Sequence, residues 1–166
     1  MITPAYVLTM AHYNRWQNAS LFGAATALGN DARNASRGAF FGSIHGTLCH
    51  LMWADEIWIH RFAKTPKPEG GIQESPNLVP DWAMLASRRS AFDQVMTDWA
   101  NQIDPAWLTD EITWFSAAVG QEMRKPAALL VMHMFNHQTH HRGQVHAMLT
   151  AAGAKPEPTD LPLMPD

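Results

Sequence analysis

The sequence predicts an all-α fold in which four long helices form a single bundle. Apolar residues recur at every third or fourth position in four separate stretches, no stretch carries a strong strand pattern, and no segment repeats another. The chain has 166 residues, of which 46% are hydrophobic, and these are enough to form the core of one ordinary domain. We therefore expect one bundle domain over residues 1–153 and a Pro-rich C-terminal tail over residues 154–166.

The first helix is expected from about residue 4 to residue 28. Thr3 offers a capping oxygen, and Pro4 suits the first turn of a helix. The apolar residues that then follow helical spacing are Val7, Met10, Leu21, Ala24 and Leu28. The polar stretch 29–38 is rich in helix breakers and should end this helix.

The second helix is expected at about residues 40–63. Its apolar positions are Ile44, Leu48, Leu51, Trp58 and Phe62. Residues 64–80 contain four prolines and a pair of glycines, so they should form an irregular connection that is long enough to cross one end of the bundle. Such a connection permits an order of helices in space that differs from their order in the chain.

The third helix is expected to begin after Asp81, which is a typical N-cap residue, and to end near residues 103–105. It is amphipathic, with apolar residues at Trp82, Leu85, Phe92, Met96 and Trp99. This apolar stripe passes over Arg89. We expect Arg89 to lie at the boundary of the core with its charged head in water.

The fourth helix is expected from Pro126 to Gly153, with apolar residues at Leu130, Met134, Val145 and Met148. The preceding segment, residues 105–125, has only a weak pattern. Within it, residues 111–115 could form a short extended piece and Gly120 a turn. The tail after Gly153 should be extended and loosely held.

The composition argues against several classes of protein. The net charge is −3, and the 12 Lys and Arg residues are scattered, which disfavours binding to nucleic acid. No apolar run approaches the roughly 18–20 residues that span a bilayer. The single cysteine, Cys49, cannot form an internal disulfide, and no leader is evident, so we expect a cytoplasmic protein.

A histidine cluster in the fourth helix predicts a metal site. His137 and His141 are four residues apart, so their imidazoles share one helical face about one turn apart and can bind the same metal ion. They also lie on the apolar stripe of this helix, where a buried imidazole must satisfy its ring nitrogens. His140 is offset from His141 by about 100° and is expected to face elsewhere.

The third ligand should come from another helix, because catalytic zinc-type sites use three protein ligands and leave one position open. The second helix offers His45, Cys49, His50, Asp55 and His60, and spacing alone does not choose among them. Cys49 is more typical of a small buried residue than of a ligand. For the histidines outside the site, the expectation is a core residue bonded to a carbonyl group; these are His12, His45, His60, His133 and His146.

Three segments resemble the DinB family, whose members are bundle-shaped metal proteins related to the YfiT-like thiol transferases. Residues 13–16 read YNRW, residues 47–58 read TLCHLMWADEIW, and residues 135–144 read FNHQTHHRGQ. The resemblance implies a four-helix bundle with a non-sequential, up-down-down-up topology. It also implies a homodimer and a site for zinc or nickel, in which the metal ligands would be His50, His137 and His141.

The resemblance favours an enzyme that activates a low-molecular-weight thiol and transfers it to a small electrophilic substrate. A cation held by three neutral imidazoles keeps its charge and can lower the pKa of a bound thiol or water. The alternatives are a metal-dependent hydrolase that uses metal-bound hydroxide and a non-catalytic, stress-associated metal-binding protein. The hydrolase lacks an acidic base beside the histidines of the kind found in H-E-x-x-H sites.

Two polar residues that interrupt or follow the apolar stripes are candidate contacts to substrate or to a metal ligand. Asn14 interrupts the stripe of the first helix, and Gln144 follows the histidines of the fourth. The metal itself is not determined by the ligands, because three imidazoles suit zinc, nickel, copper and iron alike.

Overall fold

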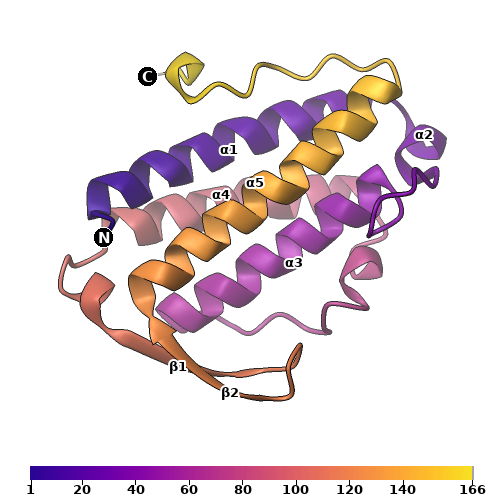
Figure 1. Cartoon of the computed structure of the whole chain (residues 1–166). Coiled ribbons are helices and arrows are strands. Elements are labelled where there is room, and N and C mark those ends of the chain that lie inside the picture. Colours follow the sequence, from indigo (N-terminus) through magenta and orange to yellow (C-terminus); the bar gives the residue numbers. More distant parts are fainter. Residues whose placement is uncertain (166) are drawn as a thin grey trace.

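Four long helices make up most of the computed structural model, which describes residues 1–165 (Figure 1). The last residue of the predicted tail, 166, lies outside the described part. The long helices are α1 (Pro4–Ala27), α3 (Ile44–Ala63), α4 (Trp82–Asn101) and α5 (Ala127–Ala151). Their bounds lie close to those expected from the apolar periodicity, except that α3 begins about four residues later than expected.

Short polar side chains fix where three of these helices begin. The side chain of Thr3 accepts a hydrogen bond from the Tyr6 amide, and that of Asp81 accepts one from the Met84 amide. Ser43 caps α3 in the same way. The late start of α3 follows from this cap, because the chain before it makes a tight turn in which the Arg37 amide donates to the Gly42 carbonyl at 2.8 Å.

A short helix that the polar sequence did not predict, α2 (Asn30–Asn34), follows α1. Arg33 in α2 is buried. Its guanidinium donates to the carbonyl groups of Ala25 and Thr26 at 3.1 and 3.2 Å. These carbonyls belong to the last turn of α1, where regular intrahelical bonds run out. The Thr26 carbonyl also accepts from the Gly29 amide at 3.3 Å, so Arg33 adds a second partner there and holds α2 against the helix end.

The helices that carry the histidine motifs are neighbours in space. α3 packs against α5, whereas α1 packs against α4 and α5 (Figure 1). Neighbours in space are therefore not always neighbours in the chain. The up-down-down-up bundle topology as such stays a prediction. No helix within residues 1–165 combines the length and the apolar character that crossing a membrane would require.

The all-α expectation needs one correction, because residues 111–126 form a β-hairpin. β1 (Glu111–Ser116) pairs antiparallel with β2 (Gln121–Pro126), and the turn between them contains Gly120 at φ +68°. β1 alternates exposed and partly buried residues, and Ile112 and Trp114 pack against the core. β2 reads QEMRKP and lacks apolar alternation, so the sequence indicated only the first strand.

The C-terminal tail is extended, as expected, but it is not loosely held. It runs along α1 (Figure 1), and its backbone is bonded to polar side chains of that helix. Tyr13 Oη donates to the Thr159 carbonyl at 2.6 Å, and Gln17 Nε2 donates to the Pro158 carbonyl at 2.9 Å. The Glu157 amide donates to Ser20 Oγ at 2.8 Å. These three bonds hold the backbone of the tail against α1.

A layer of buried polar residues divides the core into two apolar halves. One half surrounds Phe135 and Met134, and the other surrounds Leu48 and Leu149. Every long helix contributes to the layer at the point where its residues pass from one half to the other; the members are Asn14, Asn18, Asp55, Arg89, Asp93, Gln138 and Arg142. The expectation that the Arg89 head group would lie in water is therefore wrong, because Arg89 is only 3% exposed.

Candidate metal centre

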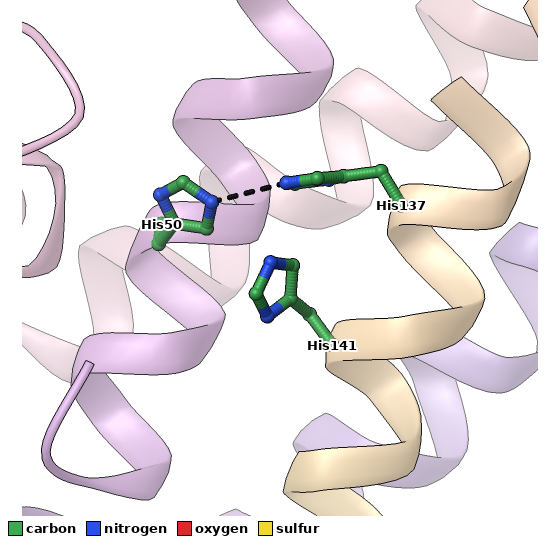
Figure 2. Close-up of side chains that lie close together, drawn as sticks. All are labelled: His50, His137 and His141. Atoms are coloured by element: carbon green, nitrogen blue, oxygen red, sulfur yellow. Dashed lines mark hydrogen bonds between the residues drawn. The ribbon is translucent and has the colours of Figure 1, made fainter. Parts of the chain in front are cut away.

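Three histidines from two helices meet between α3 and α5 (Figure 2). His50 comes from α3, and His137 and His141 come from successive turns of α5. The Nε2 atoms of His50 and His137 are 3.3 Å apart. One ligand nitrogen from each of the three rings lies within 4.8 Å of the other two. The three histidines therefore form a group that could hold a metal ion.

Hydrogen bonds behind two of the rings set their tautomers. Ser75 Oγ donates its proton to the Ile72 carbonyl at 2.7 Å. The same oxygen lies 2.8 Å from His50 Nδ1 and therefore accepts a hydrogen bond from it. The Nδ1 atom of His141 lies 2.7 Å from Gln144 Oε1, which can only accept. In both rings the proton therefore sits on Nδ1, and the Nε2 lone pair is free to bind a cation.

Burial keeps the imidazoles neutral. His50 is 3% exposed and His141 is 8% exposed. Burial, and next the charge that His141 would carry, lowers the pKa of His50 to about 3. Burial together with the neighbouring histidines lowers the pKa of His137 to about 3 as well, and burial also lowers the pKa of His141. The three rings are thus neutral imidazoles at neutral pH, the form that binds a metal ion.

The ring of Phe41 covers one side of the cluster. It stacks on His50 with ring centroids 3.7 Å apart and an angle of 20° between the planes. It also lies 5.4 Å from the His141 ring. Phe41 lies two residues before the Ser43 cap of α3. The turn that precedes this helix therefore also places the Phe41 ring against the imidazoles.

The arrangement fits a divalent cation. Nitrogen ligands bind zinc at about 2.0–2.1 Å, so two of them in a tetrahedral set lie about 3.3–3.4 Å apart. The Nε2 atoms of His50 and His137 already have this separation. Neutral imidazole nitrogens also suit zinc, copper, iron and nickel. The donor set, its protonation and the spacing of this pair are therefore compatible with a metal site.

Two cavities of unequal size meet at the histidines. The larger, of about 800 Å³, lies between α3, the hairpin and α5, and both His50 and His137 line it. The smaller, of about 370 Å³, is lined by all three histidines and by Phe41, His140 and Gln144. The cluster is consequently open to ligands from two sides.

Comparison with known proteins gives the family. The model of the DinB family matches residues 1–166. The chain belongs to the DinB family. Among its relatives is protein DinB of Bacillus subtilis (strain 168), which is 23% identical over 156 residues, or 93% of this chain and 91% of that protein. This confirms the resemblance that the three sequence segments carried.

A solved structure supports the same DinB fold. The crystal structure of a DinB-like protein from Bacillus cereus ATCC 10987 superposes with a TM-score of 0.63 and 16% sequence identity. The match covers 86% of this chain and 90% of that one. At this identity the likeness concerns the fold alone.

Of the five candidates on the second predicted helix of this DinB-family protein, only His50 meets the histidines of α5. His45 instead bonds through Nε2 to the Val79 carbonyl at 2.8 Å. Cys49 is buried and accepts from the Val79 amide. His60 bonds to the Thr65 carbonyl. The carbonyl-bonded interpretation is confirmed for His45 and His60.

That interpretation is wrong for two other histidines, His12 and His133, because both are exposed. His133 instead lies in the wall of the larger cavity. It is one turn before His137 on α5, and the two rings are 6.0 Å apart. An exposed histidine of this kind looks the same in the sequence as a core histidine on the same helix.

Gln144 and Asn14 lie in different places. Gln144 is bonded to His141 and lines the smaller cavity. Asn14 lies in the buried polar layer, where it accepts from Arg142 and its amide is 3.4 Å from Asp93 Oδ1. Ser75 and Phe41 were missed, because a serine in a proline-rich connection and a phenylalanine in a turn give no sequence signal for contact with histidines.

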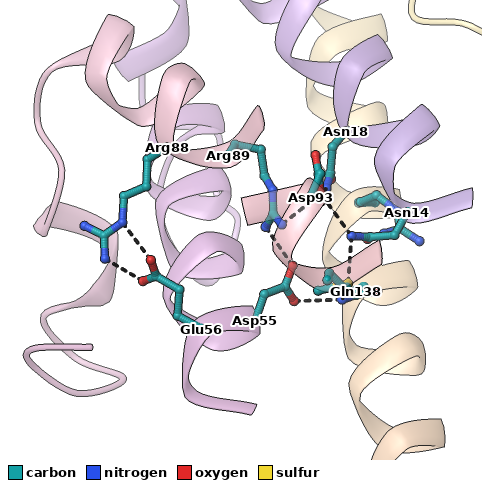
Figure 3. Close-up of polar contacts among 10 residues, drawn as sticks. Asn14, Asn18, Asp55, Glu56, Arg88, Arg89, Asp93 and Gln138 are labelled. Atoms are coloured by element: carbon teal, nitrogen blue, oxygen red, sulfur yellow. Dashed lines mark hydrogen bonds and ion pairs between the residues drawn. The ribbon is translucent and has the colours of Figure 1, made fainter. Parts of the chain in front are cut away.

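The polar layer in this DinB-family protein is a charge-balanced cluster (Figure 3). Arg89 lies between Asp55, at 2.7 Å, and Asp93, at 2.8 Å. Gln138 Nε2 donates to Asp55 Oδ1 at 2.9 Å, and Asn18 donates to Asp93 at 2.9 Å. With Arg142, which donates to Asn14 Oδ1, the cluster contains two carboxylates and two guanidinium groups, so its formal charges balance.

The same layer also positions the histidines. Gln138 and Arg142 directly follow His137 and His141 in the sequence, so α5 presents two rows of polar side chains about 100° apart. One row faces the cavities, and the other faces the bundle interior. The bond from Gln138 to Asp55 links α5 to α3 beside the histidine cluster.

Proposed function

We propose that this protein is a metal-dependent enzyme that transfers a low-molecular-weight thiol to an electrophilic carbon. His50, His137 and His141 would bind one zinc or nickel ion between α3 and α5. The observation that carries the proposal is the meeting of two cavities at this cluster, because a transfer reaction needs room for two molecules beside one reactive centre.

The cation would supply positive charge that lowers the pKa of a thiol bound to it. The residues of the chain do the rest. Phe41 shields one side of the imidazoles from water. Gln144 and His140 line the smaller cavity and offer hydrogen bonds to the polar part of a thiol. The larger cavity would hold the electrophile with its reacting carbon toward His50 and His137.

In the transfer, the thiol loses its proton to solvent and its sulfur forms a bond to the electrophilic carbon. The bond from that carbon to its leaving group breaks, and the leaving group departs with the electron pair. No oxidant or reductant is consumed. The family resemblance supports this choice of reaction. The proposal retains the homodimer that the resemblance implies and the cytoplasmic location that the single cysteine and the N-terminal sequence led us to expect.

Hydrolysis is less well supported. A hydrolase of this kind commonly uses an acidic side chain as general base. Among residues 1–165, no Asp or Glu lines either cavity. A purely structural metal is also less well supported, because structural zinc sites are closed by four protein ligands, whereas the cluster has three histidines.

The test is a screen of the zinc-loaded and nickel-loaded protein with chlorodinitrobenzene and several cellular thiols. We expect conjugation above the uncatalysed rate with at least one thiol, and loss of this rate in His141→Ala. His12→Ala is the matched control, because His12 is exposed on α1 and lies outside both cavities. Binding of one metal ion without turnover would replace the proposal with a structural role, and cleavage of an ester substrate without thiol transfer would replace it with a hydrolase.

A further inference from the structure

The larger cavity has walls that suit a flat apolar molecule. Three tryptophans line it, Trp53 and Trp58 from α3 and Trp114 from β1. The aliphatic side chains of Ile57 and Leu130 complete the apolar lining. A volume of about 800 Å³ is within the usual range for sites that bind drug-sized molecules. Aromatic side chains of this kind stack on planar ligands.

The charged residues that line this cavity have one sign. Arg61, Lys67 and Lys125 line it, and within residues 1–165 no Asp or Glu does. The chain as a whole has 15 acidic residues and 12 basic ones, so a lining with three cations and no acid is the reverse of the average composition. A cavity with low-dielectric walls and one sign of charge concentrates ligands of the opposite sign.

Arg61 differs from three other arginines of the chain. Arg88, Arg89 and Arg124 each pair with a carboxylate. Arg61 is partly buried and has neither an ion pair nor a hydrogen bond within the described residues 1–165.

Its guanidinium is nevertheless held in place by aromatic rings. It lies 4.4 Å from the centroid of the Trp58 ring and 5.6 Å from that of Trp114. A planar guanidinium that is held in place by aromatic rings and has no ion-pair or hydrogen-bond partner can bind a carboxylate or sulfonate with two parallel hydrogen bonds.

A row of rings leads from Arg61 to the metal centre. Trp58, which stacks under Arg61, lies 5.1 Å from the His133 ring, and His133 lies 6.0 Å from His137. An aromatic molecule whose anionic group reaches Arg61 would therefore extend along Trp58 and His133 toward the histidine cluster. We propose that the larger cavity binds aromatic carboxylates or sulfonates, with Arg61 as the residue that recognises the anionic group.

This assignment rests on the proposed function in one respect only, since it identifies the electrophile of the transfer as an aromatic anion. Lys67 and Lys125 are exposed at the rim and would attract the anion at longer range. Arg61 would provide the specific contact. The assignment concerns binding, so it can be tested in the absence of metal.

The experiment is a calorimetric titration of the metal-free protein with naphthalene sulfonate, beside the neutral naphthalene sulfonamide. We expect the sulfonate to bind about tenfold or more tightly than the sulfonamide, because the charge-assisted contact is missing in the latter. Arg61→Met should remove this difference. Arg61→Lys keeps the charge without the planar fork and should give an intermediate affinity.

Arg124→Met is the matched control, because it makes the same charge change on the hairpin outside the cavity lining. It should leave the affinity for the sulfonate within about twofold of the unmodified protein. Equal binding of the sulfonate and the sulfonamide, or sulfonate affinity that Arg61→Met and Arg61→Lys both leave unchanged, would overturn the assignment. The melting temperature of each variant shows whether it is folded.

The outcomes separate this assignment from the proposed transfer. If no thiol is conjugated to any electrophile but sulfonate binding depends on Arg61, the cavity assignment stands and the transfer is wrong. If thiols are transferred to neutral arenes and Arg61→Met does not alter sulfonate binding, the transfer stands and the cavity assignment is wrong.

Discussion

Asp55 on α3 and Gln138 on α5 are joined by a buried hydrogen bond of 2.9 Å, beside the residues that form the histidine cluster. Gln138 directly follows His137, and Asp55 lies five residues after His50. The same carboxylate pairs with Arg89 of α4. The position of the histidines relative to one another therefore depends on a polar contact in the interior as well as on apolar packing.

We expect Asp55→Ala to destabilise the fold strongly. It leaves the buried Arg89 guanidinium with one carboxylate instead of two, and breaking a buried ion pair typically costs about 3–5 kcal/mol. Glu56→Ala is a matched control, because Glu56 is the next residue and pairs with Arg88, whose side chain is 43% exposed. Surface pairs contribute at most about 1 kcal/mol. Urea unfolding of both variants measures the difference, and similar losses would contradict the role assigned to the buried cluster.

Ser75→Ala should weaken metal binding without touching a ligand. Ser75 accepts the Nδ1 proton of His50, and removing such a partner typically lowers metal affinity about 10–100-fold. Competition with a chromophoric chelator measures the affinity of the protein for zinc. Ser90→Ala on the exposed face of α4 serves as the control. If Ser75→Ala and Ser90→Ala bound zinc equally well, the hydrogen bond behind His50 would have no part in holding the metal.

Metal should also raise the stability of the unmodified protein. A ligand that binds only the folded state stabilises it by about 2.7 kcal/mol when its free concentration is 100 times its dissociation constant. We expect a higher melting temperature with zinc or nickel, and a much smaller increase in His137→Ala. A melting temperature that zinc and nickel leave unchanged would argue against the metal centre.

Without metal, the free energy of unfolding should fall as the pH is lowered from 7.5 to 5. The pKa values of His50 and His137 are lowered to about 3 in the fold, below the value of about 6.5 in the unfolded chain. Between these values the unfolded chain binds more protons, so stability decreases as the pH falls toward the folded pKa. Urea midpoints across this range measure the effect. The double variant His50→Gln/His137→Gln should show a flatter dependence, and an equally steep one would contradict the assignment.

Tyr13→Phe should loosen the C-terminal tail. It removes the hydrogen bond from Tyr13 Oη to the Thr159 carbonyl, and one such bond contributes about 0.5–1.5 kcal/mol. We expect faster cleavage of the tail by a protease at low concentration, with little change in the unfolding of the bundle. Tyr6→Phe, on the same helix, is the control. Equal cleavage rates in the two variants would show that the Tyr13 bond does not hold the tail.

The sequence was sufficient to predict the long helices and the pair of histidines on α5. Both depend on local spacing, because a period of three to four residues determines which side chains share a face whatever the rest of the chain does. The choice of His50 came from the family resemblance. Spacing alone did not separate His50 from His45, since the packing of α3 against α5 decides which of them meets His137.

The elements that sequence reasoning missed depend on contacts between distant residues. Arg89 was expected at the surface, because a charged residue is rarely buried without partners. One partner, Asp55, lies on α3 and is distant in the sequence, whereas the other, Asp93, is one turn away on α4. β2 was missed because its residues lack apolar alternation and the strand is held in place by pairing with β1. Ser75 reaches His50 through a connection without periodic structure.

The layer of charge between the two apolar halves of the core has a further consequence for how the helices can align. Sliding any long helix along its axis by one turn, about 5.4 Å, would move its polar residues against the apolar side chains of one half. Arg89 would then leave Asp55, and an unpaired charge would lie among leucine and methionine residues. A purely apolar core would tolerate such a shift, whereas the buried polar layer favours a single alignment of the four helices.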